Sequence, residues 1–396
     1  MQFNAPKYVR QILFGLQSRG HSAYVVGGCV RDIIMGVQPN DWDICTSAHP
    51  EEVLELFPGS RPTGIKHGTV TVVIGNHTSE VTTFRSDGEY RDHRRPEAVT
   101  FVSDLISDLS RRDFTMNAIA LSADGLISDP FGGIQDIQNK TIKCVGVPKL
   151  RFTEDALRMF RALRFSARLG FTIEYETLNA ITDCAPLASG LAPERVRDEL
   201  EKIMMTDRPD TLGAAVSFGL LDRYVRRSGQ KLPPFAELAG VSRKPLYRWI
   251  VFADMLRCYG LVPDAHELLA SLRLDGRTLR CCRSAVEITA SPPPDSAFGW
   301  KKLLNAYGVD AVCCAVAIYE AIHGIGCEKE LKAVLNSGEC FTFRKLAVTG
   351  DDLLSLGLKG HALGEMLKFL LEYVMEYPQN NRREILLELA KYSEES

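Results

Sequence analysis

Apolar and polar positions follow two different periods along the chain. Up to about residue 150, short runs rich in valine, isoleucine and threonine predict strands. These runs lie at 23–28, 41–46, 68–75, 79–85 and 98–102, and helical patterns at 6–20 and 29–36 alternate with them. Beyond residue 150 the apolar positions recur with the period of a helix. We therefore predict an α+β head with a small mixed or antiparallel sheet, followed by an all-α remainder.

Capping residues, proline and glycine indicate where several predicted helices begin and end. A helix over 153–170 would begin at a threonine or glutamate and stop at Gly170, and one over 192–205 has Pro193 in its first turn. The segment 111–120 predicts the start of a helix that Asp113 would cap. The polar, charged stretch 86–97 has no apolar period and predicts a mobile surface loop.

Composition and charge are those of an ordinary globular protein. The chain has 396 residues, 45% of them hydrophobic and 24% charged, and its net charge is -3. Contacts with nucleic acid would therefore have to come from local basic patches. The 11 cysteines include no C-x-x-C pair, which favours free thiols over a zinc site or a disulfide framework. No signal peptide and no apolar run long enough for a bilayer is evident, so we expect a cytoplasmic protein without a membrane partner.

Two aspartates flank a single tryptophan in the segment "NDWDIC". On a strand, side chains at i and i+2 share a face, so Asp41 and Asp43 would project together and Trp42 would point the other way. Carboxylates this close repel each other unless a cation lies between them, and Mg²⁺ prefers oxygen ligands that it shares with phosphates. Glu80, on a later strand, is the candidate third carboxylate. The alternatives are a surface turn for the two aspartates and an exposed edge-strand residue for Glu80.

A glycine pair precedes these aspartates. Gly27 and Gly28 stand between a predicted strand and a predicted helix, where backbone N–H groups can approach a phosphate. Arg31, in the first turn of that helix, can reach the same anion. Glycine pair, arginine and paired aspartates in this order favour phosphate chemistry more than any of them does alone.

Together with three further segments, these motifs resemble a known family. The segments are "RRDFTMNA" from Arg111, "DPFGG" from Asp129 and "EDALRMFRALRF" from Glu154. The chain is similar to the bacterial-type transfer RNA nucleotidyltransferases, which comprise CCA-adding enzymes and bacterial poly(A) polymerases of the polymerase-beta-like superfamily. The resemblance implies a head (1–150), neck (151–210), body (211–335) and tail (336–396). It also implies Mg²⁺ on Asp41 and Asp43 and nucleotide contacts at Gly28, Arg31, Arg112, Asp155, Arg158, Arg161 and Arg164.

The predicted helix that begins near Thr153 carries an arginine on nearly every turn. Arg158, Arg161, Arg164 and Arg168 fall within about 120° of arc, opposite an apolar face. Asp155 and Arg158, three residues apart, would be neighbours. An aspartate that accepts and an arginine that donates hydrogen bonds suit cytosine and adenine, whereas uracil and guanine present a carbonyl to the aspartate. The alternative is an ordinary surface ion pair.

We therefore predict a CCA-adding enzyme. It would transfer CMP, CMP and AMP in turn from CTP and ATP to the 3′ end of transfer RNA, with Asp41, Asp43 and Glu80 as catalytic residues. Family members that add only A, only CC or poly(A) share the same motifs, so these alternatives stay open. A non-catalytic RNA-binding protein with a relic head and a small-molecule nucleotidyltransferase are the rivals from other classes, and a homodimer is left open.

Overall fold

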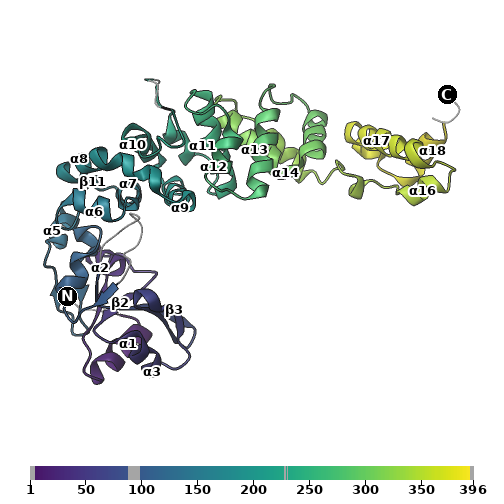
Figure 1. The fold of residues 1–396 in the computed structure, drawn as a ribbon. Helices are drawn as coiled ribbons and strands as arrows, with labels where there is room; N and C mark the ends of the chain where they lie inside the picture. The colour runs from purple at the N-terminus through teal and green to yellow at the C-terminus, as the bar shows by residue number, and fades with distance from the viewer. Residues whose placement is uncertain (1–4, 88–98, 227–228, 230, 393–396) are drawn as a thin grey trace. The chain divides into compact units, whose positions relative to one another are not determined.

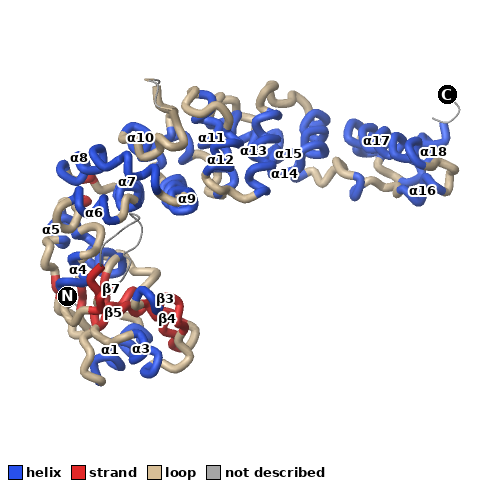
Figure 2. Tube along the Cα trace, viewed as in Figure 1, coloured by secondary structure: helices blue, strands red, loops and turns tan. Residues whose placement is uncertain are grey.

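The computed structural model describes residues 5–87, 99–226, 229 and 231–392. The chain forms two compact units, Met1–Arg227 and Ser228–Ser396. The first unit holds the strands and the second consists of helices and loops in its described part (Figures 1 and 2). An α+β head followed by a helical remainder is confirmed. The four-part division into head, neck, body and tail stays a prediction.

A seven-stranded mixed sheet organises the head. Its strands lie in the order β3 (Arg61–Gly64), β4 (Thr69–Ile74), β5 (His77–Thr83), β2 (Asp43–Thr46), β1 (Ala23–Val26), β8 (Ala120–Leu121) and β9 (Ile127–Ser128). All neighbours are antiparallel except β2 and β5, which run parallel with Asp43 opposite Glu80. The register therefore sets two predicted catalytic carboxylates side by side.

Two helices, α1 (Lys7–Ser18) and α3 (Pro50–Leu56), pack on each other and on strands of the sheet. Val9, Ile12, Leu13 and Leu16 form the buried stripe of α1, as its apolar period predicts. The turn at Gly27 leads from β1 into α2 (Gly28–Ile34). Gly27 has φ +79°, a conformation that favours glycine.

The paired aspartates begin β2 and do not lie within it. The strand starts at Asp43, so the prediction that Asp41 belongs to it is wrong, and Asp41 lies in the bend that precedes it. The predicted alternation is nevertheless confirmed, because Asp41 and Asp43 are exposed and Trp42 is buried. Cys45, two residues beyond Asp43, is buried in an apolar cluster with Leu109 and Val145. The exposed carboxylates therefore stand at the edge of a packed core.

Other strands and turns of the head differ in detail from the predicted elements. Ser86 and Asp87 belong to β6 (Arg85–Asp87), which pairs with β7 (Val99–Phe101), so the predicted loop begins later than Ser86. Residues 88–97 of that loop lie outside the described part. The helix predicted over 111–120 is wrong, because Thr115–Asn117 forms only one 3₁₀ turn after α4 (Leu105–Ser110). Asp113 does not cap that turn.

The arginine-rich segment is divided by a break. Helix α6 (Pro148–Glu154) ends before Asp155, and α7 (Leu157–Leu169) begins after it, so the predicted continuous helix through Asp155 is wrong. Asp155 is extended, with φ -141° and ψ 102°. Gly170 ends α7 in the left-handed region, as predicted. Helix α7 packs on α9 (Pro193–Met204) and α10 (Leu212–Ser217), while α6 packs on α8 (Tyr175–Cys184). The first unit also contains α5 (Gly133–Gln138) and a parallel pair of short strands, β10 (Thr141–Ile142) and β11 (Thr172–Ile173).

The second unit is helical in its described residues. Its helices are α11 (Pro245–Cys258), α12 (Ala265–Ser271), α13 (Gly276–Ile288), α14 (Ala297–Ala321), α15 (Glu328–Asn336), α16 (Gly350–Leu354), α17 (Gly360–Glu376) and α18 (Arg383–Tyr392). Among the described helices, α14 alone has the length and hydropathy of a membrane span, contrary to the prediction that no segment has them. It kinks at Gly308 and packs on α11 and α13, with Trp300 and Val312 buried. This packing is that of a core helix.

Candidate active site

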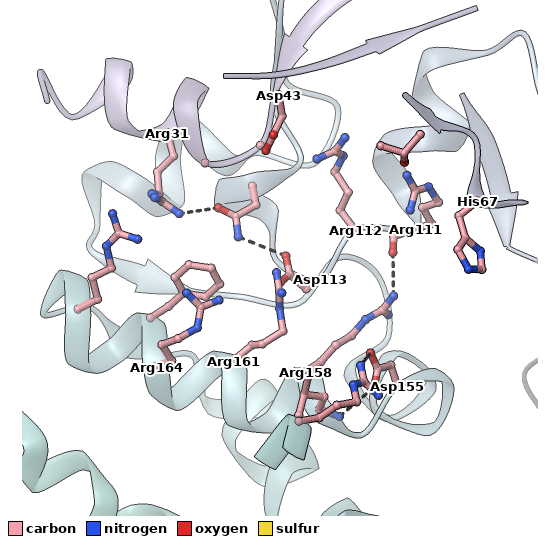
Figure 3. Close-up of a pocket in the computed structure, with 18 of the residues that line it drawn as sticks. Arg31, Asp43, His67, Arg111, Arg112, Asp113, Asp155, Arg158, Arg161 and Arg164 are labelled. Atoms are coloured by element: carbon pink, nitrogen blue, oxygen red, sulfur yellow. Dashed lines mark hydrogen bonds and ion pairs between the residues drawn. The ribbon is translucent and has the colours of Figure 1, made fainter. Parts of the chain in front are cut away.

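A polar cavity of about 630 Å³ opens at the Gly27 turn and runs along α7 (Figure 3). Nine arginines and three aspartates line it, so the cavity is strongly cationic. All seven predicted nucleotide-binding residues are among its lining, together with Asp43. The full lining is Gly27, Gly28, Arg31, Asp43, His67, Thr69, Arg85, Arg111, Arg112, Asp113, Asn117, Asp155, Leu157, Arg158, Arg161, Arg164, Phe165, Arg168 and Arg195.

The carboxylates at the sheet edge repel one another. The pKa of Asp43 is raised, first by loss of solvation and then by the charges of Glu80 and Asp41, while Arg112 acts in the opposite direction. Asp41 and Glu80 are therefore close enough to Asp43 to disfavour its ionised form, although neither lines the cavity. A cation beside these oxygens would remove the repulsion.

The donors fit Mg²⁺ only as a partial ligand set. Among the described residues, no group of three or more histidine, cysteine, aspartate or glutamate side chains is close enough to hold a metal ion. Mg²⁺ is commonly held by one or two carboxylates, with waters and substrate phosphates completing its shell. Asp41 and Asp43 supply hard oxygen donors of this kind, next to a cationic cavity suited to phosphates.

Two neighbouring arginines reach the cavity from the end of α4. Arg112 lies beside the Gly27 turn and near Asp43 (Figure 3), and a Cβ placed on Gly27 would approach Nη1 of Arg112 to 3.2 Å. The same Cβ would lie 3.7 Å from Oδ2 of Asp43. Because only a hydrogen occupies this point, the turn, the carboxylate and the guanidinium come together. Arg112 and its neighbour Arg111 both form ion pairs with the fully buried Asp108.

A hydrogen-bonded chain connects α2 with α7. Nη1 of Arg31 donates to Oδ1 of Asn117 (2.8 Å), and Nδ2 of Asn117 donates to Asp113 (3.2 Å), as Figure 3 shows. Asp113 also pairs with Arg161 at 2.6 Å. Burial alone would raise the pKa of Asp113, but Arg161 and Asn117 outweigh it and lower that pKa to about 2. Arg31 is 3% exposed and also binds Asp32, so its guanidinium is held rigidly at the cavity wall.

Asp155 and Arg158 both line the cavity, and their side chains bind different partners, although the backbone N–H of Arg158 donates to the carbonyl oxygen of Asp155 at 3.0 Å. Arg158 donates to Glu154 (2.8 Å) and to the backbone carbonyl oxygen of Arg111 (2.9 Å; Figure 3). Asp155 accepts from Arg195 of α9 at 2.9 Å and from the backbone N–H of Leu157 at 3.1 Å. The prediction that both residues lie on one helix is wrong, because Asp155 stands in the break between α6 and α7. They remain close along the chain and line the same cavity, but no side-chain bond joins them in the described part of the chain.

Two arginines of α7, together with Arg31 of α2, surround one aromatic ring. The guanidinium carbon of Arg164 lies 4.2 Å from the ring centre of Phe165, and those of Arg31 and Arg161 lie at 5.4 and 5.8 Å. Arg164 also pairs with the buried Glu199 at 2.6 Å. Met159, Phe160, Leu163 and Ala167 are buried on the opposite face, as predicted.

Three residues in or behind the cavity wall were not predicted from the sequence. Arg195 lies in a helix whose charge pattern is that of an ordinary exposed helix, and Asn117 is a single amide in an apolar stretch. Asp108 contacts the cavity only through the arginines. Asn117 lies in the motif "RRDFTMNA", but no role was predicted for it or for the other two residues, because their roles depend on partners brought near by the fold.

Comparison with known proteins agrees with this geometry. Residues 23–143 match the family model described as the poly A polymerase head domain, and residues 170–225 match a probable RNA- and SrmB-binding site of polymerase A. A CCA-adding enzyme of Limosilactobacillus fermentum is 38% identical over 395 residues, which is 96% of this chain and 95% of the relative. One of Geobacillus sp. is 40% identical over 354 residues, covering 87% of this chain and 85% of the relative.

Comparison of the fold with solved structures also finds a CCA-adding enzyme. A crystal structure of the Bacillus stearothermophilus CCA-adding enzyme in complex with CTP superimposes with a TM-score of 0.80 at 32% identity, covering 98% of this chain and 97% of that one. Near-complete coverage extends the likeness to the helical unit, where the sequence carries no motif. This chain belongs to the family of CCA-adding enzymes, which are transfer RNA nucleotidyltransferases.

Proposed function

We propose that this protein adds CMP, CMP and AMP in turn to the 3′ end of transfer RNA, using CTP and ATP and releasing pyrophosphate. The observation that carries the proposal is a single cavity that joins the Asp43 carboxylate at the sheet edge to the arginines of α7. The curated relatives that match 85–95% of their own length are named CCA-adding enzymes, which favours this reaction over A-only, CC-only or poly(A) addition.

We propose that Asp41 and Asp43 hold Mg²⁺ and that Glu80 assists them from the adjacent strand. Bound Mg²⁺ supplies charge neutralisation for the phosphates and lowers the pKa of the attacking hydroxyl. The protein itself positions the reactants: Gly28 permits close approach of the triphosphate, and Arg31 and Arg112 donate to it. No nucleophilic side chain is required, because the 3′ hydroxyl of the RNA attacks the α-phosphate and pyrophosphate leaves.

The part of the cavity lined by Asp155 and the arginines of α7 would select the base. Asp155 uses two of its lone-pair positions on Arg195 and Leu157, which leaves others for the exocyclic amino group of cytosine or adenine. Arg158 would donate to the neighbouring ring nitrogen, and Arg161 and Arg164 would support the nucleotide. Uracil or guanine would place a carbonyl oxygen against the Asp155 carboxylate and leave buried polar groups unpaired.

The test uses transfer RNAs that lack one, two or three 3′ nucleotides, each incubated with Mg²⁺ and with CTP, ATP or both. Addition of the missing nucleotides only, followed by arrest at CCA, supports the proposal. Long A tails would identify a poly(A) polymerase, and extension of a single truncation would identify an A-adding or CC-adding enzyme. A cytoplasmic location, a possible homodimer and the four-part domain division stay predictions.

A further inference from the structure

One fully buried carboxylate lies beneath two of the cavity arginines. Asp108, on α4, is 0% exposed and does not line the cavity. Its Oδ1 accepts from Nε and Nη2 of Arg111 at 3.0 and 2.9 Å, and its Oδ2 accepts from Nη2 of Arg112 at 3.2 Å. Oδ1 also accepts from the backbone N–H of Arg85, the first residue of β6, at 3.3 Å. The Asp108 carboxylate therefore binds three arginines of this wall of the cavity, Arg111 and Arg112 through their side chains and Arg85 through its backbone.

Each carboxylate oxygen holds one guanidinium. Arg111 and Arg112 are sequence neighbours at the end of a helix, where consecutive side chains diverge by about 100°. Both turn toward the cavity because each binds a different oxygen of Asp108. The guanidinium group of Arg112 keeps donors that Asp108 does not use. Its Nε is buried without a hydrogen-bond partner in the described part of the chain, and its Nη1 lies beside the Gly27 turn.

The charges in this group do not cancel. One negative carboxylate faces two guanidinium groups, so the group presents a net positive charge to the cavity. The two side chains are 17% and 19% exposed, and the carboxylate is hidden behind them. A polyanion in the cavity would therefore meet the arginine donors without meeting the charge that orients them.

We propose that Asp108 is a positioning residue that orients Arg111 and Arg112 toward the β- and γ-phosphates of the incoming nucleotide. The inference rests on the proposed binding of CTP and ATP in this cavity. Asp108 touches neither nucleotide nor RNA and acts only through the two arginines. Its contribution should therefore be specific to the phosphates that distinguish CTP from CMP.

The experiment measures equilibrium binding of CTP and of CMP to the full chain with Mg²⁺ present, for the wild type and for Asp108→Asn. We expect the CTP-to-CMP affinity ratio of the variant to fall by about 10-fold or more, since charge-assisted hydrogen bonds that orient both arginines are weakened. The affinity for CMP should stay nearly constant. In an Arg112→Ala background, Asp108→Asn should lower the ratio much less than it does alone, because the two residues act as a unit.

Asp254→Asn is the matched control. Asp254 is also 0% exposed and also binds an arginine three residues later, Arg257 at 2.6 Å, but it lies in the second unit. Its substitution should lower stability without changing the CTP-to-CMP ratio. If Asp108→Asn does not fold, Asp108→Glu replaces it, since the longer side chain keeps the charge and displaces both oxygens; the same fall in the ratio is expected.

Two outcomes separate this inference from the proposed function. A folded Asp108 variant with the wild-type ratio would overturn the positioning role and leave Asp108 as a structural residue. A wild-type protein that binds CTP no better than CMP would instead refute the triphosphate site itself.

Discussion

Arg195 on α9 donates to Asp155, which stands in the break between α6 and α7, with 2.9 Å between Nη2 and Oδ2. The two residues are 40 positions apart, and both side chains line the cavity. The pair therefore fixes, from a second helix, the carboxylate that we propose reads the base.

Removing this carboxylate should loosen nucleotide choice. In Asp155→Ala the penalty for a carbonyl oxygen at this point disappears, so incorporation of UMP and GMP relative to CMP should rise about 10-fold or more. Arg195→Ala should shift selectivity in the same direction by a smaller factor, because Asp155 is then free to move. Competition assays with mixed nucleoside triphosphates measure both ratios.

The control for that prediction is Arg197→Ala. Arg197 lies on the same helix and pairs with Asp198 at 2.8 Å, and it does not line the cavity. Its substitution should leave the ratios unchanged. Undiminished rejection of UTP and GTP by Asp155→Ala, at normal affinity for transfer RNA, would refute the reading role.

The ion pair between Asp113 and Arg161 should make stability depend on pH in the acid range. The folded pKa of Asp113, about 2, lies below the ordinary value of about 3.9. A lowered pKa stabilises the folded state above the unfolded-state pKa, and this contribution is lost as the pH falls from about 4 toward 2. Asp113→Asn should therefore cost about 1–3 kcal/mol at pH 7, and the difference from wild type should shrink below about pH 4.

Urea unfolding at several pH values, followed by circular dichroism, measures this difference. A gap between wild type and variant that stays constant or widens toward pH 3 would show that the charge of Asp113 is not the source of its contribution.

Two glycines with positive φ should respond differently to alanine. Gly27 and Gly36 have φ +79° and +74°, so alanine at either position is strained by about 1–3 kcal/mol. Only at Gly27 would the new methyl group also approach Arg112, to 3.2 Å, whereas nothing lies within 4 Å of the corresponding point at Gly36. Gly27→Ala should therefore raise the KM for CTP, while Gly36→Ala should lower the melting temperature alone. Equal effects of the two substitutions on KM would contradict a close approach of phosphate to this turn.

The parts of the site that depend on local pattern were predictable. Alternation around Trp42 gave the exposure of both aspartates, and the period of α7 gave the arginine face. The break at Asp155 was not predictable, since no proline or glycine interrupts the helical pattern there. It depends on the bonds of Asp155 to Leu157 and to the distant Arg195. Asp108 was missed for the same reason: its partners become visible only when burial and direction are known.

The central claim is that the carboxylates at the sheet edge carry the transfer of nucleotides and do not hold the fold together. The most direct measurement is single-turnover CMP transfer to a transfer RNA lacking CCA by Asp43→Asn, together with its melting temperature. We predict a rate lower by about 1000-fold or more, because charge stabilisation of several kcal/mol is lost. The melting temperature should be unchanged or higher, because the raised pKa of Asp43 means that its ionised form is disfavoured in the folded protein. A near-normal rate, or a loss of activity explained by unfolding, would contradict the account.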